Sequence, residues 1–260
     1  MKLQRLAARG LALASVLALA ACASTGASNP RDPWEPFNRH AYTFNEGLDN
    51  ILLKPAATFY RDKVPPLVRT GVSNFFGNLN DAWSAANNLM QWRLLEFEES
   101  LARVQLNTMF GVFGIFDVAS EFNIERHRED FGQTLGRWGV PAGPYLMLPF
   151  FGPSTLRDAV ALPVDTQFDP VRQISGSAAR DLTYVLRAVD RRSNLLRVGN
   201  VLEEAALDKY SFTRDAYLQR RRAEIYDREQ TREVPPSLPD ESKDAPADAP
   251  AEAPAAPPQR

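Results

Sequence analysis

The sequence predicts an all-α protein with a single folded domain. Apolar side chains recur at helical spacing through most of the chain, with charged side chains on the opposite faces. The breaks between these stretches contain proline or glycine, which end helices and form turns. Strand-like alternation and internal repeats are missing from the sequence, and only residues 146–150 suit a minor extended piece. The predicted helical domain covers residues 32–229, a length typical of one domain with a sizeable core.

The first predicted helices lie between proline breaks. A helix over residues 37–51 keeps its apolar spacing throughout, and Pro55 is expected to lie just beyond its end. The proline pair ending at Pro66 suits the first turn of a second helix, where a missing N–H costs nothing. A third, short helix is expected to begin at a cap on Asn80 or Asp81.

A fourth helix is expected from about Glu96, and its amphipathic pattern disappears before its end. Residues 106–122 are apolar on several sides and contain Gly111 and Gly114 as flexible points. A segment that is apolar all round lies in a deep core or in a membrane. The deep core is the more common outcome, although the combination of phenylalanine and glycine also suits contact with disordered acyl chains.

The last third of the domain is predicted to be helical as well. Ser154 is a good N-cap for a helix that stops before Pro163, which then marks a loop. An amphipathic helix over residues 180–191 follows, and further helices are expected over residues 195–210 and 213–227. The side chains predicted to face the core are Leu182, Val185, Leu186 and Val189 in the first of these helices, and Leu195, Leu202 and Ala206 in the second.

Residues 131–158 form a central segment that is rich in glycine and proline and has no acidic side chain before its last position. Three of its glycines recur at helical spacing. Because glycine inside a helix costs about 1 kcal/mol relative to alanine, a small, flat face is expected there, open to a neighbouring helix or an acyl chain. Residues 145–151 are continuously apolar but too short to span a bilayer. The segment is therefore either part of an ordinary core or a curved apolar surface that touches lipid. In the second interpretation, the predicted lipid or channel contacts are Gly132, Gly136, Gly139, Tyr145, Leu146, Met147, Leu148, Phe150 and Phe151.

The start of the chain predicts an exported, lipidated protein. Residues 1–21 combine a basic beginning with a short apolar run, the pattern of a secretory signal. This stretch ends in Leu-Ala-Ala before Cys22, the sole cysteine of the sequence, and resembles a bacterial lipobox. Cys22 is therefore the predicted lipidation site, and residues 22–31 are a lipidated tether. The alternative is an ordinary secretory signal with an incidental cysteine. No aspartate follows the cysteine, a pattern that resembles lipoproteins sent to the outer membrane.

The other end of the chain predicts a disordered tail over residues 230–260. This stretch consists mainly of Pro, Ala, Asp and Glu and cannot bury enough apolar surface to fold. The formal net charge of the sequence is −2, which offers no basic footprint for nucleic acid. The basic cluster at residues 220–222 is expected to be a solvated helix face or, alternatively, a contact with lipid phosphates.

The sequence offers no convincing catalytic or cofactor site. It has no phosphate-binding loop of the P-loop type. His40 and His127 are its only histidines and lack neighbouring ligands, so a zinc site is not expected. Ser154 does not lie in a nucleophile elbow, and the glutamates near Glu96 form a charged helix face rather than a buried acid–base pair. We therefore predict that the protein is not an enzyme and needs no metal or cofactor.

Several separated motifs, in a fixed order, resemble one protein family. They are DPWEPFNR from Asp32, VSNFFGNL from Val72, DFGQTLG from Asp130, GPYLMLP from Gly143 and GPSTLRD from Gly152. Together they make the chain similar to the MlaA (VacJ) lipoproteins over residues 32–226. The C-terminal tail falls outside the resemblance.

The resemblance implies an outer-membrane lipoprotein that maintains lipid asymmetry. It implies a ring of helices lying in the membrane interface, anchored on the periplasmic side, with a central amphipathic channel. Such a protein takes mislocalised phospholipid from the outer leaflet and passes it to a periplasmic carrier similar to MlaC, often while associated with a trimeric porin. The alternative function is a structural or peptidoglycan-tethering envelope lipoprotein without lipid transport. An esterase or phospholipase is a third, less favoured alternative, because no nucleophile–base pair is visible.

Overall fold

The structure is a computed structural model that describes residues 29–227, with the backbone alone described for residues 198–205. It confirms the predicted all-α fold class, and the minor extended piece expected over residues 146–150 overlaps the first strand of one small antiparallel hairpin. The predicted signal peptide, the lipidation of Cys22 and the C-terminal tail lie outside the described residues. The helices are α2 (Glu35–Leu48), α3 (Lys54–Lys63), α4 (Pro66–Met90), α5 (Leu94–Met109), α6 (Val118–Glu121), α7 (Phe131–Arg137), α8 (Leu156–Phe168), α9 (Ser177–Ala205) and α10 (Lys209–Arg222). The strands are β1 (Tyr145–Leu148) and β2 (Gly152–Thr155), and the shorter helical turns are η1 (Asp49–Leu53), η2 (Pro170–Gln173) and η3 (Ala223–Asp227).

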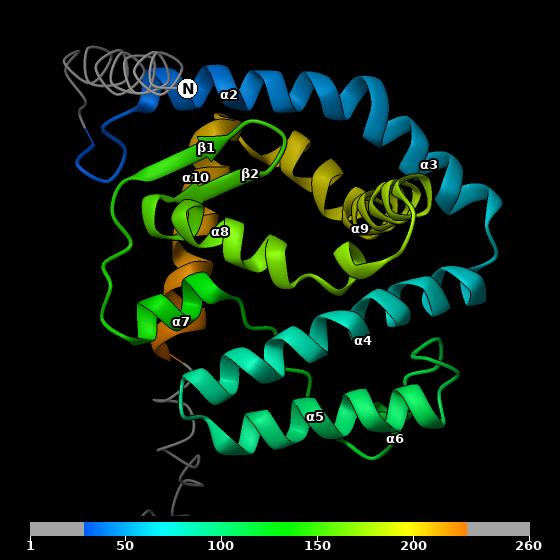
Figure 1. The fold of residues 1–260 in the computed structure, drawn as a ribbon. Coiled ribbons are helices and arrows are strands. Elements are labelled where there is room, and N and C mark those ends of the chain that lie inside the picture. The colour runs from blue at the N-terminus through cyan, green and yellow to red at the C-terminus, as the bar shows by residue number, and fades with distance from the viewer. Residues whose placement is uncertain (1–28, 228–260) are drawn as a thin grey trace, which may run out of the picture.

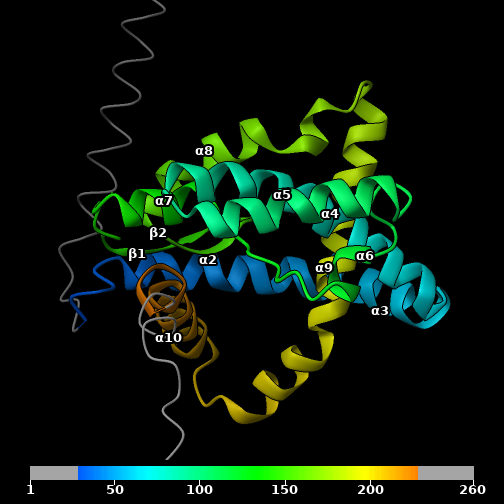
Figure 2. The same ribbon diagram turned by 90° about the horizontal axis from the view of Figure 1, so that it is seen from below.

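The elements follow one another around a closed circuit (Figure 1). Helices α2 and α3 form one side of it, α4 crosses the opposite side, and α7 and the hairpin close the remaining side. Helix α5 packs along α4, and α8 packs against α7. Figure 2 shows that most elements lie in a flat layer, whereas α9 runs across this layer and leads to α10 on one side of it. Helix α9 is held in this position by packing against α3 and α4.

The prediction that Pro55 lies beyond the end of the first helix is wrong. The chain stays helical from α2 through the π-helical turn η1 into α3, and Pro55 occupies the first turn of α3. Because the helix is continuous here, Pro55 lacks an N–H that would otherwise bond to a carbonyl of the preceding turn. The π-helical turn takes up the local irregularity, so the helix changes course without stopping.

The second and third predicted helices are in fact one helix, α4. Asp81 does not cap a new helix but lies inside α4 with a side chain that is 1% exposed. Its carboxylate pairs with Arg103 at 3.3 Å and with Arg126 at 3.2 Å. The acidic side chain of Asp81 within this long helix is therefore explained by tertiary ion pairs rather than by a helix end.

Helix α8 begins and ends later than the sequence indicated. Thr155, not Ser154, is its N-cap and accepts a hydrogen bond from the N–H of Asp158 at 3.3 Å. Pro163 lies inside α8 rather than in a loop. It cannot donate to the carbonyl of Ala159 one turn earlier, which is the usual cost of an internal proline.

The predicted inward face of α9 is also wrong. Leu182, Val185 and Leu186 are exposed, and Leu182 keeps 69% of its accessible surface. Leu195 is exposed as well, whereas Ala206 is half-buried, and Leu202 lies in the stretch with backbone alone described. The predicted helices over 180–191 and 195–210 form the single helix α9, and the last predicted helix begins at Lys209.

The side of α9 that packs against the protein is largely polar. Asp190 is buried and accepts hydrogen bonds from the hydroxyls of Tyr60 at 3.2 Å and Ser73 at 2.8 Å. Ser193 and Leu196 are buried near it. Because polar bonds fix α9 in place, its apolar side chains are left facing outward.

Candidate functional site

The hairpin β1–β2 is attached to α2 by two asparagines. The amide of Asn38 donates to the carbonyl of Tyr145 at 3.1 Å and accepts from the N–H of Met147 at 2.8 Å. Asn45 makes the same pair of bonds farther along, donating to the carbonyl of Leu148 at 2.9 Å and accepting from the N–H of Phe150 at 2.8 Å. The exposed edge of β1 is thereby satisfied by side chains instead of another strand.

Asp32 joins the start of the helical domain to its last helix. Its buried carboxylate accepts hydrogen bonds from Asn38 at 2.8 Å, from the hydroxyl of Tyr210, and from Arg214 at 3.2 Å. Burial and the negative charge of Asp32 together raise the pKa of Tyr210. The first motif, from Asp32 to Asn38, therefore connects α2, β1 and α10 at one point.

Gly132 and Gly136 lie against a charged network rather than an open apolar face. Arg221 binds Asp130 at 2.6 Å and Asp158 at 3.0 Å. A Cβ atom added to Gly132 would lie 2.5 Å from Oδ1 of Asp158 and 2.6 Å from Nη2 of Arg221. One added to Gly136 would lie 2.7 Å from a guanidinium nitrogen, that of Arg157. The small residues at these positions are thus explained by the close approach of charged side chains.

The tip of the hairpin, residues 149–151, presents aromatic side chains to the outside. Phe150 and Phe151 are 72% and 68% exposed. Phe150 has a positive φ of 67°, unusual for a bulky residue, and its N–H bond to Asn45 holds this conformation. Its ring packs edge-on against Phe44 of α2, with 5.2 Å between the ring centroids.

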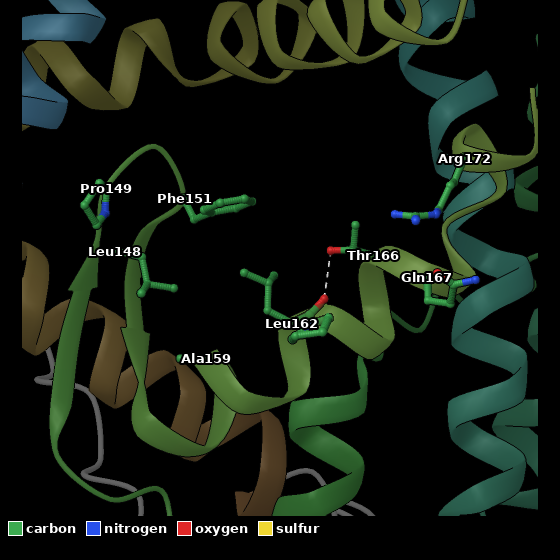
Figure 3. Close-up of a pocket in the computed structure, with 9 residues that line it drawn as sticks. Leu148, Pro149, Phe151, Ala159, Leu162, Thr166, Gln167 and Arg172 are labelled. Atoms are coloured by element: carbon green, nitrogen blue, oxygen red, sulfur yellow. Dashed lines mark hydrogen bonds between the residues drawn. The ribbon is translucent and has the colours of Figure 1, made fainter. Parts of the chain in front are cut away.

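A cavity of about 620 Å³ lies between the hairpin tip and α8. One side of it is apolar and is lined by Leu148, Pro149 and Phe151 of the hairpin and by Leu162 of α8. Figure 3 shows the guanidinium of Arg172 pointing into the cavity from the opposite end. The remaining lining residues are Ala159, Pro163, Thr166 and Gln167. The cavity is therefore amphipathic, with apolar walls and a cation at one end.

Many large apolar side chains are exposed at the surface, and where they are contiguous they mark a surface that contacts a membrane or another protein. Of the two alternatives left open for residues 106–122, a deep core is contradicted by the structure, because Phe113 keeps 73% of its accessible surface. The exposed large apolar side chains of this segment are Met109, Phe110, Val112, Phe113, Ile115, Phe116 and Phe122. Others lie on the turn η1, on α3, and on the first turns of α4 and α5: Ile51, Leu52, Phe59, Leu67, Val68, Leu94 and Leu95. These elements lie along the outer perimeter of the layer (Figure 1), and we call the two sets together the apolar rim.

The loop between α5 and α6, which is part of the apolar rim, is held in place by a buried arginine. Arg103 is 1% exposed and donates to both carboxylate oxygens of Asp117, at 2.6 and 2.8 Å. Asn107 donates to Asp117 at 3.0 Å and accepts from the N–H of Ala119 at 2.8 Å. Val112 and Phe113 both have positive φ angles, of 51° and 56°. Such a strained conformation persists only where surrounding contacts fix it, so the network presents these apolar side chains in one defined arrangement.

The structure brings together only some of the predicted contact residues. Leu148 and Phe151 line the cavity, and Phe150 lies at the exposed tip beside it. Tyr145 and Met147 are fully buried in the core with Ala41 and Tyr210, because alternate side chains of a strand point to opposite faces. The predicted lipid contact of these two residues is therefore corrected. Leu146 is half-buried on the other face of β1, and Gly139 lies in a turn with a φ of 89°.

Sequence reasoning missed the α8 and η2 side of the cavity. Leu162, Thr166 and Arg172 carry no motif by themselves, and only the fold places them opposite the hairpin. The internal proline of α8 was the one available signal, but it was interpreted as a helix end. Among the described residues, no group of histidine, cysteine and acidic side chains is arranged to hold a metal ion. Within the same residues, no helix has the length and apolar character needed to cross a membrane.

These features define a class of protein: a helical protein with an amphipathic cavity and a large apolar outer surface. A family model described as "MlaA lipoprotein" matches residues 30–224. The chain belongs to the MlaA lipoprotein family.

Relatives of known name support this membership. A protein from Escherichia coli (strain K12) named "Intermembrane phospholipid transport system lipoprotein MlaA" is 38% identical over 216 residues, covering 81% of this chain and 85% of the relative. A protein of the same name from Haemophilus influenzae is 33% identical over 225 residues, covering 83% of this chain and 89% of the relative. A solved structure described as "Structural basis for maintenance of bacterial outer membrane lipid asymmetry" has a TM-score of 0.65 and 35% identity. It covers 75% of this chain and 98% of the other.

Proposed function

We propose that this protein removes mislocalised phospholipid from the outer leaflet of the outer membrane and passes it to a soluble periplasmic carrier similar to MlaC. In this proposal it lies on the periplasmic side of the membrane, anchored through Cys22, and a trimeric porin is its neighbour there. The names of its relatives support two parts of this proposal: phospholipid as the transported molecule and the cell envelope as the location. The carrier and the porin rest on the family resemblance alone.

The observation that carries the proposal is the amphipathic cavity between the hairpin and α8. A phospholipid has two apolar chains and a charged headgroup, so its route needs apolar walls and a polar end. Leu148, Phe151 and Leu162 supply such walls, and Arg172 supplies a cation at the other end. Passage of a lipid needs no bond to break, and we propose transport without catalysis.

A pair of neighbouring substitutions on α8 tests this function. Ala159 lines the cavity, whereas Val160, the next residue, is 67% exposed. Ala159→Trp fills the cavity and is expected to lower phospholipid transfer from vesicles to an acceptor protein at least tenfold. Val160→Trp adds the same ring beside it and is expected to leave transfer within twofold of the natural protein.

Both variants are compared for melting temperature and for phospholipid that copurifies with the protein. Equal transfer by the two variants, with both folded, would contradict a route through this cavity. Binding to cell-wall sacculi without copurified lipid would favour the tethering alternative. Release of free fatty acid during transfer would instead show an enzyme.

A further inference from the structure

A second pocket lies between the start of the helical domain and its last helix. It has a volume of about 400 Å³ and is bordered by Asn29 and Arg31 on one side and by one face of α10 on the other. The lining side chains of α10 recur at helical spacing: Arg214, Asp215, Leu218, Gln219 and Arg222. We call this pocket the α10 groove. It shares no lining residue with the cavity beside the hairpin.

The N-terminal wall of the α10 groove is held in place by two other elements. The carbonyl of Arg31 accepts a hydrogen bond from the N–H of Tyr145 on β1 at 2.9 Å. The next residue, Asp32, pairs with Arg214 of α10 at 3.2 Å. Arg31 is therefore positioned at the Arg214 end of the groove. Arg222 lies two helical turns after Arg214, about 12 Å away along the axis at a rise of 1.5 Å per residue.

The α10 groove is positively charged and contains two cations without a counter-ion. Arg31 and Arg222 line it, are exposed, and form no ion pair among the described residues. Arg214 is already engaged, because it pairs with Asp32 at 3.2 Å and with Asp215 at 2.9 Å. The lining thus has three guanidinium groups against one carboxylate. Its positive potential favours a ligand that carries several acidic groups.

The chain itself contains a sequence of this kind in residues 244–255. Three acidic side chains stand four residues apart there, each followed by Ala-Pro-Ala: Asp244, Asp248 and Glu252. Proline-rich sequences favour the polyproline II conformation, which rises about 3.1 Å per residue. Acidic residues four positions apart would then be about 12 Å apart. This spacing matches the two-turn rise between the ends of the α10 groove.

The connection to the groove is long enough for these acidic residues to reach it. Helix α10 ends at Arg222, and η3 follows directly and ends at Asp227. Residues 228–243 can span up to about 50 Å when extended, whereas the groove begins at Arg222 itself. Covalent linkage also gives the acidic residues an effective concentration of roughly millimolar, so weak ion pairs are sufficient to fill the groove.

We propose that residues 244–255 dock as an extended acidic segment in the α10 groove of the same chain, with carboxylates paired to Arg31 and Arg222. Leu218 is the one large apolar side chain of the groove lining, so the groove offers no walls for acyl chains. This favours a polar segment of the chain over a lipid as its occupant. An external anion would reach the two guanidinium groups only by displacing the segment. The inference is independent of the proposed function.

Time-resolved fluorescence anisotropy tests this docking. The experiment uses the full mature chain with Cys22→Ser, kept in solution by a non-ionic detergent, so that Ala247→Cys is the single dye position. The docked dye should rotate with the whole protein at low salt and be released at about 1 M salt, where the Debye length is about 3 Å. Arg31→Gln and Arg222→Gln are each expected to lower the ratio of docked to free segment about two- to fivefold, the range for an exposed ion pair.

The matched control comes from the same helix. Arg220 lies two residues before Arg222, outside the groove lining, and pairs with Glu224 at 3.3 Å. Arg220→Gln should leave the docked fraction unchanged. Removing the charges of the segment with Asp244→Asn, Asp248→Asn and Glu252→Gln together should free it while the groove stays intact.

Two results would overturn the docking, with folding checked by circular dichroism. One is free rotation of the dye at low salt in the natural chain. The other is an equal loss of docking in Arg220→Gln and Arg222→Gln, which would show diffuse attraction instead of a defined groove. Flotation with phosphatidylglycerol vesicles tests the other occupant. If Arg222→Gln weakened vesicle binding and left the anisotropy unchanged, the groove would be a headgroup site and the docking would be contradicted.

Discussion

At the scale of single residues, the two glycines of α7 show how a position predicted as a lipid contact can instead be explained by packing. Gly132 and Gly136 were predicted as lipid or channel contacts because glycine is costly inside a helix. The structure gives each of them a charged neighbour within 3 Å of an added Cβ atom. A steric requirement of a buried ionic network is therefore sufficient to explain both positions, and any role in lipid contact stays a prediction.

Gly132→Ala is expected to destabilise the protein by about 1–3 kcal/mol, the usual cost of overpacking. The added methyl group would displace Asp158 and Arg221, which bind one another at 3.0 Å. Gly47→Ala is the control, because a Cβ atom there meets nothing within 4 Å. That change should stabilise α2 by roughly 0.5–1 kcal/mol. Chemical denaturation measures both. A Gly132→Ala protein of natural stability that lost lipid transfer would restore the lipid-contact interpretation.

At the scale of elements, the hairpin depends on α2 for its edge bonds. Asn45→Ala removes a donor and an acceptor from the hairpin tip and leaves the carbonyl of Leu148 and the N–H of Phe150 without their partner. We expect a loss of about 1–2 kcal/mol in stability and faster amide hydrogen exchange at Phe150. Thr43→Ala, also on α2, removes only a bond to the carbonyl of Arg39 in the same helix. Exchange at the tip should be unaffected by that control, and equal protection in both variants would show that the aromatic contacts hold the tip.

The helices also show how much of the fold could be predicted from the sequence. Helical spacing identified the stretches that form α2, α4, α5, α8, α9 and α10, since periodicity is a local property of the chain, but it did not identify α3, which follows directly on η1. It also identified apolar faces correctly on α9, yet it assigned Leu182 and Val185 to a core that does not cover them. Periodicity indicates that one face of a helix is apolar. Only the tertiary structure shows whether that face packs against the rest of the protein. Arg172 escaped prediction for a related reason, because its significance depends on a hairpin and a helix that meet only in the fold.

At the scale of the whole molecule, the apolar rim is the feature that an ordinary soluble fold does not explain. Its side chains lie on successive elements along the perimeter of the layer, while α10 lies on one side of it (Figure 2). Burial of a phenylalanine side chain contributes about 1.5–3 kcal/mol, so several of them together would hold the protein at a bilayer surface. A lipidated Cys22 would add acyl chains to the same attachment.

The two contributions can be separated with a chain that begins after Cys22 and therefore has no lipid anchor. In this chain, Phe113→Glu is expected to weaken binding to phosphatidylethanolamine–phosphatidylglycerol vesicles roughly tenfold or more, because the rim loses a buried ring and gains a charge. Phe212→Glu makes the same change on α10, where Phe212 is also exposed, and should alter vesicle binding less than twofold. Flotation of vesicles with bound protein measures both, with circular dichroism as the check on folding. If the two variants lost binding equally, the lipid-facing surface would not be the perimeter, and α10 would have to lie at the membrane as well.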